Sequence, residues 1–188
     1  SWNPIGFIDD QLHREGVREV DGLPLLGGME SLAELPSTVY AVCTIGDPAA
    51  RNRVSQRISL PLATLIHPTV RMSSSVRVGA GSILTAGVVL TVNVSVGAQV
   101  ILNLGCTVGH DAVLGDLVSC MPGVHISGNV TLGRGSYLGT GAALIHQISV
   151  GEWSVIGAGA SVVSDIPPNV IAVGVPAKPI KEHKVSLE

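Results

Sequence analysis

The sequence predicts a parallel β-helix, a three-sided prism of stacked coils, with a small α/β unit before it. A hydrophobic residue recurs at every sixth position over about a hundred residues, and glycine recurs at every eighteenth. Hydrophobic residues make up 46% of the 188 residues, yet aromatic residues make up only 3%. Aromatic side chains bury the most area each in an ordinary core, so this composition favours a narrow, repetitive interior.

The six-residue repeat keeps one register throughout. Its seventeen positions are apolar, and the softest of them, Cys120, is itself a small hydrophobe. A small or β-branched residue stands two positions before most of them, and residues two apart on a strand face the same side. Each such triplet therefore predicts a short strand with both ends pointing inward. The seventeen positions are Ile66, Met72, Val78, Leu84, Leu90, Val96, Leu102, Val108, Leu114, Cys120, Ile126, Leu132, Leu138, Leu144, Val150, Ile156 and Val162.

The glycine period shows that three hexads make one coil with three flat faces. We expect these glycines to share one corner and to relieve the bend there. Coils would then stack as parallel strands about 4.8 Å apart, and each coil would bury its inward residues only against its neighbours. The recurring glycines are Gly79, Gly97, Gly115, Gly133 and Gly151.

The prism is expected over residues 62–167, with a C-terminal tail over 168–188. It ends at Pro167 and Pro168, because proline cannot donate to a strand ladder. Residues 1–61 do not repeat and suggest a small α/β unit with a parallel sheet. No opening strand and glycine-rich turn precede Ile5, so this unit is expected to be incomplete. Its predicted elements are a strand over 4–8, a short helix over 29–35, a strand over 39–45 and a helix over 48–58 capped by Asp47.

Composition argues against several functional classes. The net charge of −3 leaves no basic surplus, so we expect no nucleic-acid partner. No charged residue lies between Arg77 and Asp111, but frequent polar residues interrupt that stretch, so we expect no membrane span. The three cysteines do not have the regular spacing of a disulfide-stabilised domain, which fits a reduced, cytoplasmic protein. Cys106 and Cys120 occupy inward positions and are expected to be core residues.

One corner of the repeat differs from the others, because it carries His110 followed by Asp111. Histidine can take up a proton near neutral pH, and a neighbouring carboxylate can orient it and raise its basicity. Gly128 lies eighteen residues further on and is expected to stack above His110, leaving space there. Taken alone, such a pair is more often a solvated corner than a catalytic site.

The context of this corner, Asn-x-Gly-Cys-x-Val-x-His-Asp over residues 103–111, resembles the NeuD-like family. That family comprises bacterial sialic-acid O-acetyltransferases and nucleotide-amino-sugar N-acetyltransferases. The resemblance covers nearly the whole chain. It also includes Phe7-Ile8-Asp9-Asp10, Ile45-Gly46-Asp47, the hexads and a Gly-Val-Pro-Ala-Lys ending at Lys178.

The resemblance implies a left-handed parallel β-helix, an exception to the right-handed crossover preference, and a Rossmann-like N-terminal unit. It implies a homotrimer with its active site between adjacent prisms, acetyl-CoA as donor and a sugar or nucleotide sugar as acceptor. It makes His110 the general base, Asp111 the acid that raises its basicity, and Asn103 a lining residue of the cleft. The implied nucleotide contacts are Asp9 and Asp10, and the implied acetyl-CoA contacts are Ser119, Gly128, Thr140 and Ala158. Ser119 stands where some members carry a histidine.

The expected reaction is direct N- or O-acetylation without a covalent acyl-enzyme, and no metal is expected. Two alternatives stay open at this point. A γ-class carbonic anhydrase shares the prism but needs three histidines around zinc, two of them close in sequence, whereas here no two histidines lie within five residues. A non-catalytic β-helix scaffold is the other alternative.

Overall fold

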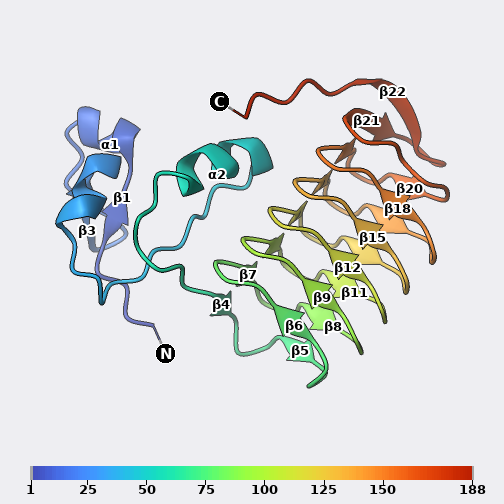
Figure 1. Cartoon of the computed structure of the whole chain (residues 1–188), viewed down its shortest axis with the longest axis horizontal. Helices are drawn as coiled ribbons and strands as arrows, with labels where there is room; N and C mark the ends of the chain where they lie inside the picture. Colours follow the sequence, from blue (N-terminus) through green and yellow to red (C-terminus); the bar gives the residue numbers. More distant parts are fainter. Residues whose placement is uncertain (1, 188) are drawn as a thin grey trace.

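The computed structural model describes residues 2–187 as a long three-sided prism with a small α/β unit beside it (Figure 1). Seventeen two-residue strands, β4 to β20, form the prism, and each of them ends on one of the seventeen predicted hexad positions. The repeat and its register are therefore confirmed. The coils wind as a left-handed β-helix, and partners on neighbouring coils are eighteen residues apart, as in Thr107 opposite His125.

Three parallel sheets form the faces, which we number in the order in which the chain crosses them. The first face contains β4 (Leu65–Ile66), β7 (Ile83–Leu84), β10 (Ile101–Leu102), β13 (Ser119–Cys120), β16 (Tyr137–Leu138) and β19 (Val155–Ile156). The second face contains β5 (Arg71–Met72), β8 (Val89–Leu90), β11 (Thr107–Val108), β14 (His125–Ile126), β17 (Ala143–Leu144) and β20 (Ser161–Val162). The third face contains β6 (Arg77–Val78), β9 (Ser95–Val96), β12 (Val113–Leu114), β15 (Thr131–Leu132) and β18 (Ser149–Val150). The first edge joins faces one and two, the second edge joins faces two and three, and the third edge closes the coil.

The interior of the prism is a continuous stack of small and aliphatic side chains. Cys106 and Cys120 belong to it and are fully buried, as predicted, and burial raises the pKa of both thiols. At the first coil Ile66 and Met72 remain 41% and 45% exposed, because no coil lies beneath them. At the other end β21 (Val170–Val173) extends the first face and pairs with β22 (Lys178–Glu182).

The glycines of the third edge serve close stacking, and the prediction that they relieve the bend is wrong. Gly79 and its equivalents have no left-handed backbone. A Cβ on Gly79 would lie 2.5 Å from the backbone of the next coil, and one on Gly133 equally close to Glu152. Other residues make the bends in the left-handed conformation. On the first edge they are all glycine, and on the second edge they are mainly Asn and Asp, which tolerate this conformation best among residues with a side chain.

The α/β unit has a three-stranded sheet in the order β1-β3-β2. Strand β1 is parallel to β3, but β2 is antiparallel to β3, so the sheet is mixed and not purely parallel as predicted. The predicted strand over 4–8 is confirmed at its end, and the helix capped by Asp47 forms but is shorter than predicted. The bounds are β1 (Phe7–Ile8), α1 (Asp10–Arg14), β2 (Glu19–Val20), β3 (Leu23–Gly27), the 3-10 helix η1 (Met29–Glu34) and α2 (Pro48–Ser55).

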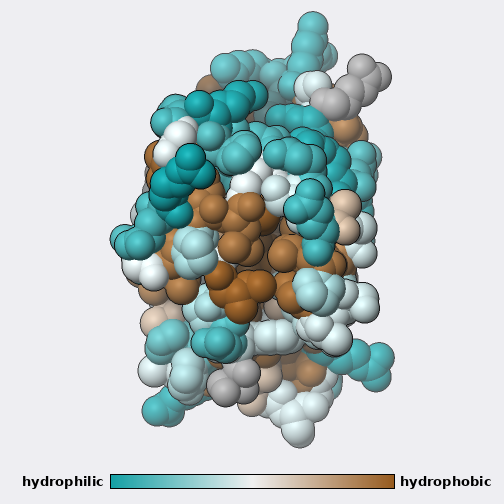
Figure 2. Space-filling view, turned by 90° about the vertical axis from the view of Figure 1, so that its left-hand side faces the viewer, coloured by the Kyte–Doolittle hydropathy of each residue, from teal (hydrophilic) through white to brown (hydrophobic). Residues whose placement is uncertain are grey.

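The predicted strand over 39–45 does not form. Within the described chain, its only bridge joins Ala41 to Leu62, and a strand needs a ladder of partners. The face of the molecule on the side of α1 and β1 presents apolar side chains in a hollow ringed by polar ones (Figure 2). The exposed large hydrophobic residues of the α/β unit include Ile5, Phe7 and Tyr40.

Candidate active site

His110 and Asp111 lie on the second edge of the prism, between β11 and β12. Nδ1 of His110 is 2.9 Å from Oδ2 of Asp111, and the two side chains are 58% and 46% exposed. The bend at Asp111 turns both side chains outward, since this residue has the left-handed φ of +57°. The structure therefore brings the predicted pair together in a position that a substrate can reach.

Asn93 lies one coil below and holds the other oxygen of the same carboxylate. Its Nδ2 donates to Oδ1 of Asp111 at 3.1 Å. The hydrogen bond from His110, followed by the one from Asn93, lowers the pKa of Asp111 below its ordinary value. Asp111 therefore stays ionised. The sequence prediction missed Asn93, although its spacing of eighteen residues from Asp111 was visible in the sequence.

The hydrogen bond to Asp111 also decides which nitrogen of His110 is free. An ionised carboxylate only accepts hydrogen bonds, so Nδ1 carries the proton and Nε2 is left as the acceptor. The ring lies against Gly128 of the next coil, where a Cβ would come within 2.5 Å of Nε2. Gly128 thus leaves room for the imidazole itself.

Three other predicted residues lie on the first edge, across the second face from His110. Asn103 is half-buried, and its Oδ1 accepts from the backbone N–H of Leu104 at 2.8 Å. Thr140 and Ala158 are exposed on successive coils, each followed by a glycine with a left-handed bend. Within one chain these residues do not meet His110.

Ser119 is buried beneath helix α2 in this chain, and its contact with acetyl-CoA stays a prediction. Helix α2 covers this part of the first face, and the exposure of Ser119 is 0%. Its hydroxyl donates to the carbonyl of Gly46 and accepts from Nη2 of Arg51, both at 2.8 Å.

Arg51 fastens α2 to the prism. It is fully buried, and its guanidinium donates to the carbonyls of Ile45, Gln99 and Leu117. Burial among these neutral acceptors lowers its pKa to about 10. Sequence reasoning had no signal for this role, because an arginine on a short helix is ordinarily solvated.

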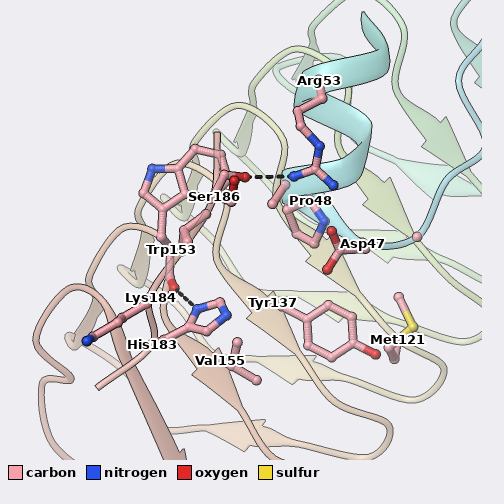
Figure 3. Close-up of a pocket in the computed structure, with 14 residues that line it drawn as sticks. Asp47, Pro48, Arg53, Met121, Tyr137, Trp153, Val155, His183, Lys184 and Ser186 are labelled. Atoms are coloured by element: carbon pink, nitrogen blue, oxygen red, sulfur yellow. Dashed lines mark hydrogen bonds between the residues drawn. The ribbon is translucent and has the colours of Figure 1, made fainter. Parts of the chain in front are cut away.

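A cavity of about 440 Å³ lies between α2, the first face and the C-terminal segment (Figure 3). Tyr137 and Trp153 contribute its aromatic wall, and Asp47 stands at the start of α2. Arg53 closes one side by donating to the carbonyl of Ser186 at 2.6 Å. In Figure 3 the ring of Tyr137 lies between Met121 and Val155 at the base of the cavity.

Comparison with known proteins identifies the family. The family model of the PglD N-terminal domain matches residues 1–58. PerB from Caulobacter crescentus, solved with CoA and GDP-perosamine, is 33% identical, with a TM-score of 0.82 over 87% of this chain and 82% of that chain. The acetyltransferase domain of PglB from Neisseria gonorrhoeae FA1090, solved with acetyl coenzyme A, is 34% identical, with a TM-score of 0.87 over 93% of this chain and 85% of that chain. The chain belongs to the NeuD-like family of nucleotide-amino-sugar acetyltransferases.

The NeuD-like fold is also that of WeeI from Acinetobacter baumannii AYE, which is 26% identical with a TM-score of 0.86 over 93% of this chain and 85% of that chain. Two further structures of the Caulobacter enzyme with CoA and GDP-perosamine carry one histidine replaced by asparagine or by alanine. No curated protein sequence gives a match. Membership makes this chain an acyltransferase, which decides against the scaffold and carbonic anhydrase alternatives.

The two acidic residues that the NeuD-like resemblance assigns to the nucleotide both have structural partners. Oδ1 of Asp9 caps α1 by accepting from Gln11 and Leu12. Asp10 accepts from the backbone N–H of Met29 at 2.7 Å and pairs with Arg57 at 3.3 Å. The bond from Met29 is the main reason that the pKa of Asp10 is lowered. Their contact with a nucleotide stays a prediction.

Among residues 2–187 of this NeuD-like chain, no helix has the length and apolar character needed to cross a membrane. Between residues 2 and 187, no three His, Cys, Asp or Glu side chains gather as a set of metal ligands.

Proposed function

We propose that this enzyme transfers the acetyl group of acetyl-CoA to the amino group of a nucleotide-linked amino sugar, with His110 as the general base. The observation that carries the proposal is the exposed His110–Asp111 pair, whose Nδ1–Oδ2 distance is 2.9 Å. The GDP-perosamine complex of PerB and its histidine variants support an amino-sugar acceptor and a functional histidine.

In the proposed step, the nitrogen of the acceptor amine attacks the thioester carbonyl carbon. Nε2 of His110 takes a proton from this amine nitrogen during the attack. A C–N bond forms, the C–S bond breaks, and CoA leaves as the thiolate, which then takes a proton. Asp111 stabilises the protonated imidazole. General-base catalysis of this kind typically contributes roughly 10²–10⁴-fold, and holding both substrates in one cleft contributes several kcal/mol more.

We assign acetyl-CoA to the first edge, along Asn103, Thr140 and Ala158. This edge fits an extended ligand, because Thr140 and Ala158 are small and exposed and the glycines that follow them have nothing within 4 Å of a Cβ position. The acetyl coenzyme A complex of the PglB domain supports a donor site in this fold. Ser119 is left out because it is buried.

We assign the nucleotide part of the acceptor to the α/β unit over 1–61, with Asp9 and Asp10 near it. The prism over 62–167 carries the chemistry and 168–188 is the tail. Helix α2 of this unit covers the first face, through Arg51 and Ser119, whereas His110 lies on the opposite edge of the same prism. A nucleotide sugar held by one copy therefore meets His110 of another copy, which favours a homotrimer whose second edge faces a neighbour's first edge. Three free, buried cysteines fit the reducing cytoplasm.

The test is a thiol-release assay with acetyl-CoA and a panel of UDP-, dTDP- and GDP-linked amino sugars, with sialic acids as hydroxyl acceptors. We expect turnover with an amino sugar and a loss of at least about 100-fold in kcat for His110→Ala. His146→Ala, on the same edge two coils away, is the matched control and should keep wild-type kcat. Wild-type turnover by a folded His110→Ala enzyme would contradict the assignment of His110 as the base. Turnover with sialic acids alone would contradict an amine as the acceptor group.

A further inference from the structure

Among the residues that the structure describes, Asn93 is the one on the second edge whose side chain reaches the catalytic carboxylate from another coil. We propose that Asn93 is a positioning residue, which acts on His110 through Asp111. This inference rests on the proposed function, because it needs His110 to be the base.

The carboxylate of Asp111 is held at both oxygens. Oδ2 accepts from His110 at 2.9 Å and Oδ1 accepts from Asn93 at 3.1 Å. Two donors on opposite oxygens fix the plane of the carboxylate, and that plane sets the direction in which Nδ1 of His110 is held. Gly128 limits the ring on its other side. The imidazole is therefore restrained by residues of three successive coils, so that Nε2 is oriented to accept a proton from one direction.

Asparagine at this corner has a simpler explanation, namely that it tolerates a left-handed bend. Asn93, Asn129 and Gln147 all have this conformation on the second edge, with φ of 57°, 57° and 60°. Between residues 2 and 187, the side chains of Asn129 and Gln147 make no hydrogen bond that would match that of Asn93. Tolerance of the bend explains the residue type at 129, whereas the contact with Asp111 is particular to Asn93.

The surroundings of the pair are otherwise neutral. Along this edge the positions equivalent to His110 carry Ser74, Val92, Gly128, His146 and Ser164. The positions equivalent to Asp111 carry Ser75, Asn93, Asn129, Gln147 and Asp165. On the coils next to His110 and Asp111, this edge therefore carries no other charged side chain, and a charge introduced at 93 acts on this pair alone.

The test compares Asn93→Gly with Asn129→Gly, because glycine keeps the left-handed bend and removes only the amide. We expect Asn93→Gly to lower kcat about tenfold, with KM for acetyl-CoA within about twofold of wild type, since the base is misdirected but the donor edge is untouched. Asn129→Gly should keep wild-type kcat. Asn93→Asp adds a second carboxylate, which favours the protonated imidazole and should move the acidic limb of the kcat/KM profile to higher pH.

The outcomes separate this inference from the proposed function. If His110→Ala loses activity while Asn93→Gly keeps wild-type kcat and Asn93→Asp keeps the wild-type pH profile, the inference is overturned and the base stands. Equal losses in Asn93→Gly and Asn129→Gly would likewise overturn it, because any change at this edge would then have the same effect. If His110→Ala keeps full turnover, both fail. A His110→Ala/Asn93→Gly double variant should be no slower than His110→Ala, as expected for residues that act as one unit.

Discussion

The imidazole of His110 lies against the backbone of Gly128 on the next coil, so that a methyl group on Gly128 would come within 2.5 Å of Nε2. The same methyl carbon would lie 2.7 Å from Cε1 and 2.8 Å from Cδ2 of the ring. The backbone of Gly128 thus limits the position of the imidazole ring of the proposed base.

Gly128→Ala should displace this ring without disturbing the prism. Gly128 does not have a left-handed backbone, so alanine fits its conformation. We expect kcat to fall by at least about tenfold, because a small misplacement of a catalytic group is costly, while the melting temperature stays close to wild type. Ser127→Ala, at the neighbouring exposed position, is the control and should be active. A folded Gly128→Ala enzyme with wild-type kcat would show that the close contact between Gly128 and the ring of His110 is not needed for catalysis.

Removing the guanidinium of Arg51 should loosen the α/β unit from the prism. Arg51→Ala removes the donor from the buried carbonyl of Leu117 and from the partly buried carbonyls of Ile45 and Gln99. A buried group left unsatisfied costs about 1–3 kcal/mol, so we expect a loss of about 2 kcal/mol in the free energy of unfolding, measured with urea. The control is Arg57→Ala, which removes an exposed ion pair to Asp10 and should cost about 0–1 kcal/mol. Equal urea midpoints for the two variants would contradict this role of Arg51.

Most of the fold could be predicted because the repeat specifies each position many times over. A single hexad is compatible with several folds, but seventeen hexads in one register are compatible with only one, the three-sided prism. The adjacency of His110 and Asp111 needed only the chain order, and Gly128 needed only the period. Asn93 could have been found in the same way, had the eighteen-residue spacing been applied to polar as well as apolar positions.

The features that the sequence did not reveal depend on contacts between distant segments. Residues 39–45 have the apolar character of a strand, but strand formation depends on a neighbour that the local sequence does not reveal. Ser119 was correctly predicted to point outward from its face. Its burial depends on α2, and the repeat carries no information about which face α2 covers.

Asp10 should contribute stability that depends on pH. Its pKa is lowered in the folded state, chiefly by the hydrogen bond from Met29. A carboxyl group whose pKa is lowered in the folded state stabilises the fold at pH values above its unfolded-state pKa of about 4. That stabilisation is lost as the pH falls through the lowered, folded-state pKa. Asp10→Asn should therefore be less stable than wild type at pH 7, and the difference should shrink as the pH falls below the ordinary carboxyl pKa of about 3.9. A difference in urea midpoint that stays constant over this range would contradict the assignment.

Mixing two inactive variants should restore activity if the site lies between copies. His110→Ala keeps an intact first edge, and Ala158→Trp blocks that edge but keeps the base. In a ring of three, any mixed trimer has one junction where an intact base faces an intact edge, so we expect roughly one third of wild-type activity per mixed trimer. The measurement is kcat of doubly tagged, co-expressed protein. Absence of recovery in isolated mixed trimers would place both parts of the site within one chain.

The eighteen-residue coil also limits how the length of this chain could change. Deleting a single hexad would turn every later residue by one third of a revolution, so that a deletion between Asn93 and Asp111 would leave the amide and the carboxylate on different edges. Only whole coils can be added or removed if residues on successive coils are to keep the same neighbours above and below them. The prism can therefore be lengthened or shortened only in steps of about 4.8 Å, and an engineered chain of intermediate length should lose activity before it loses its core.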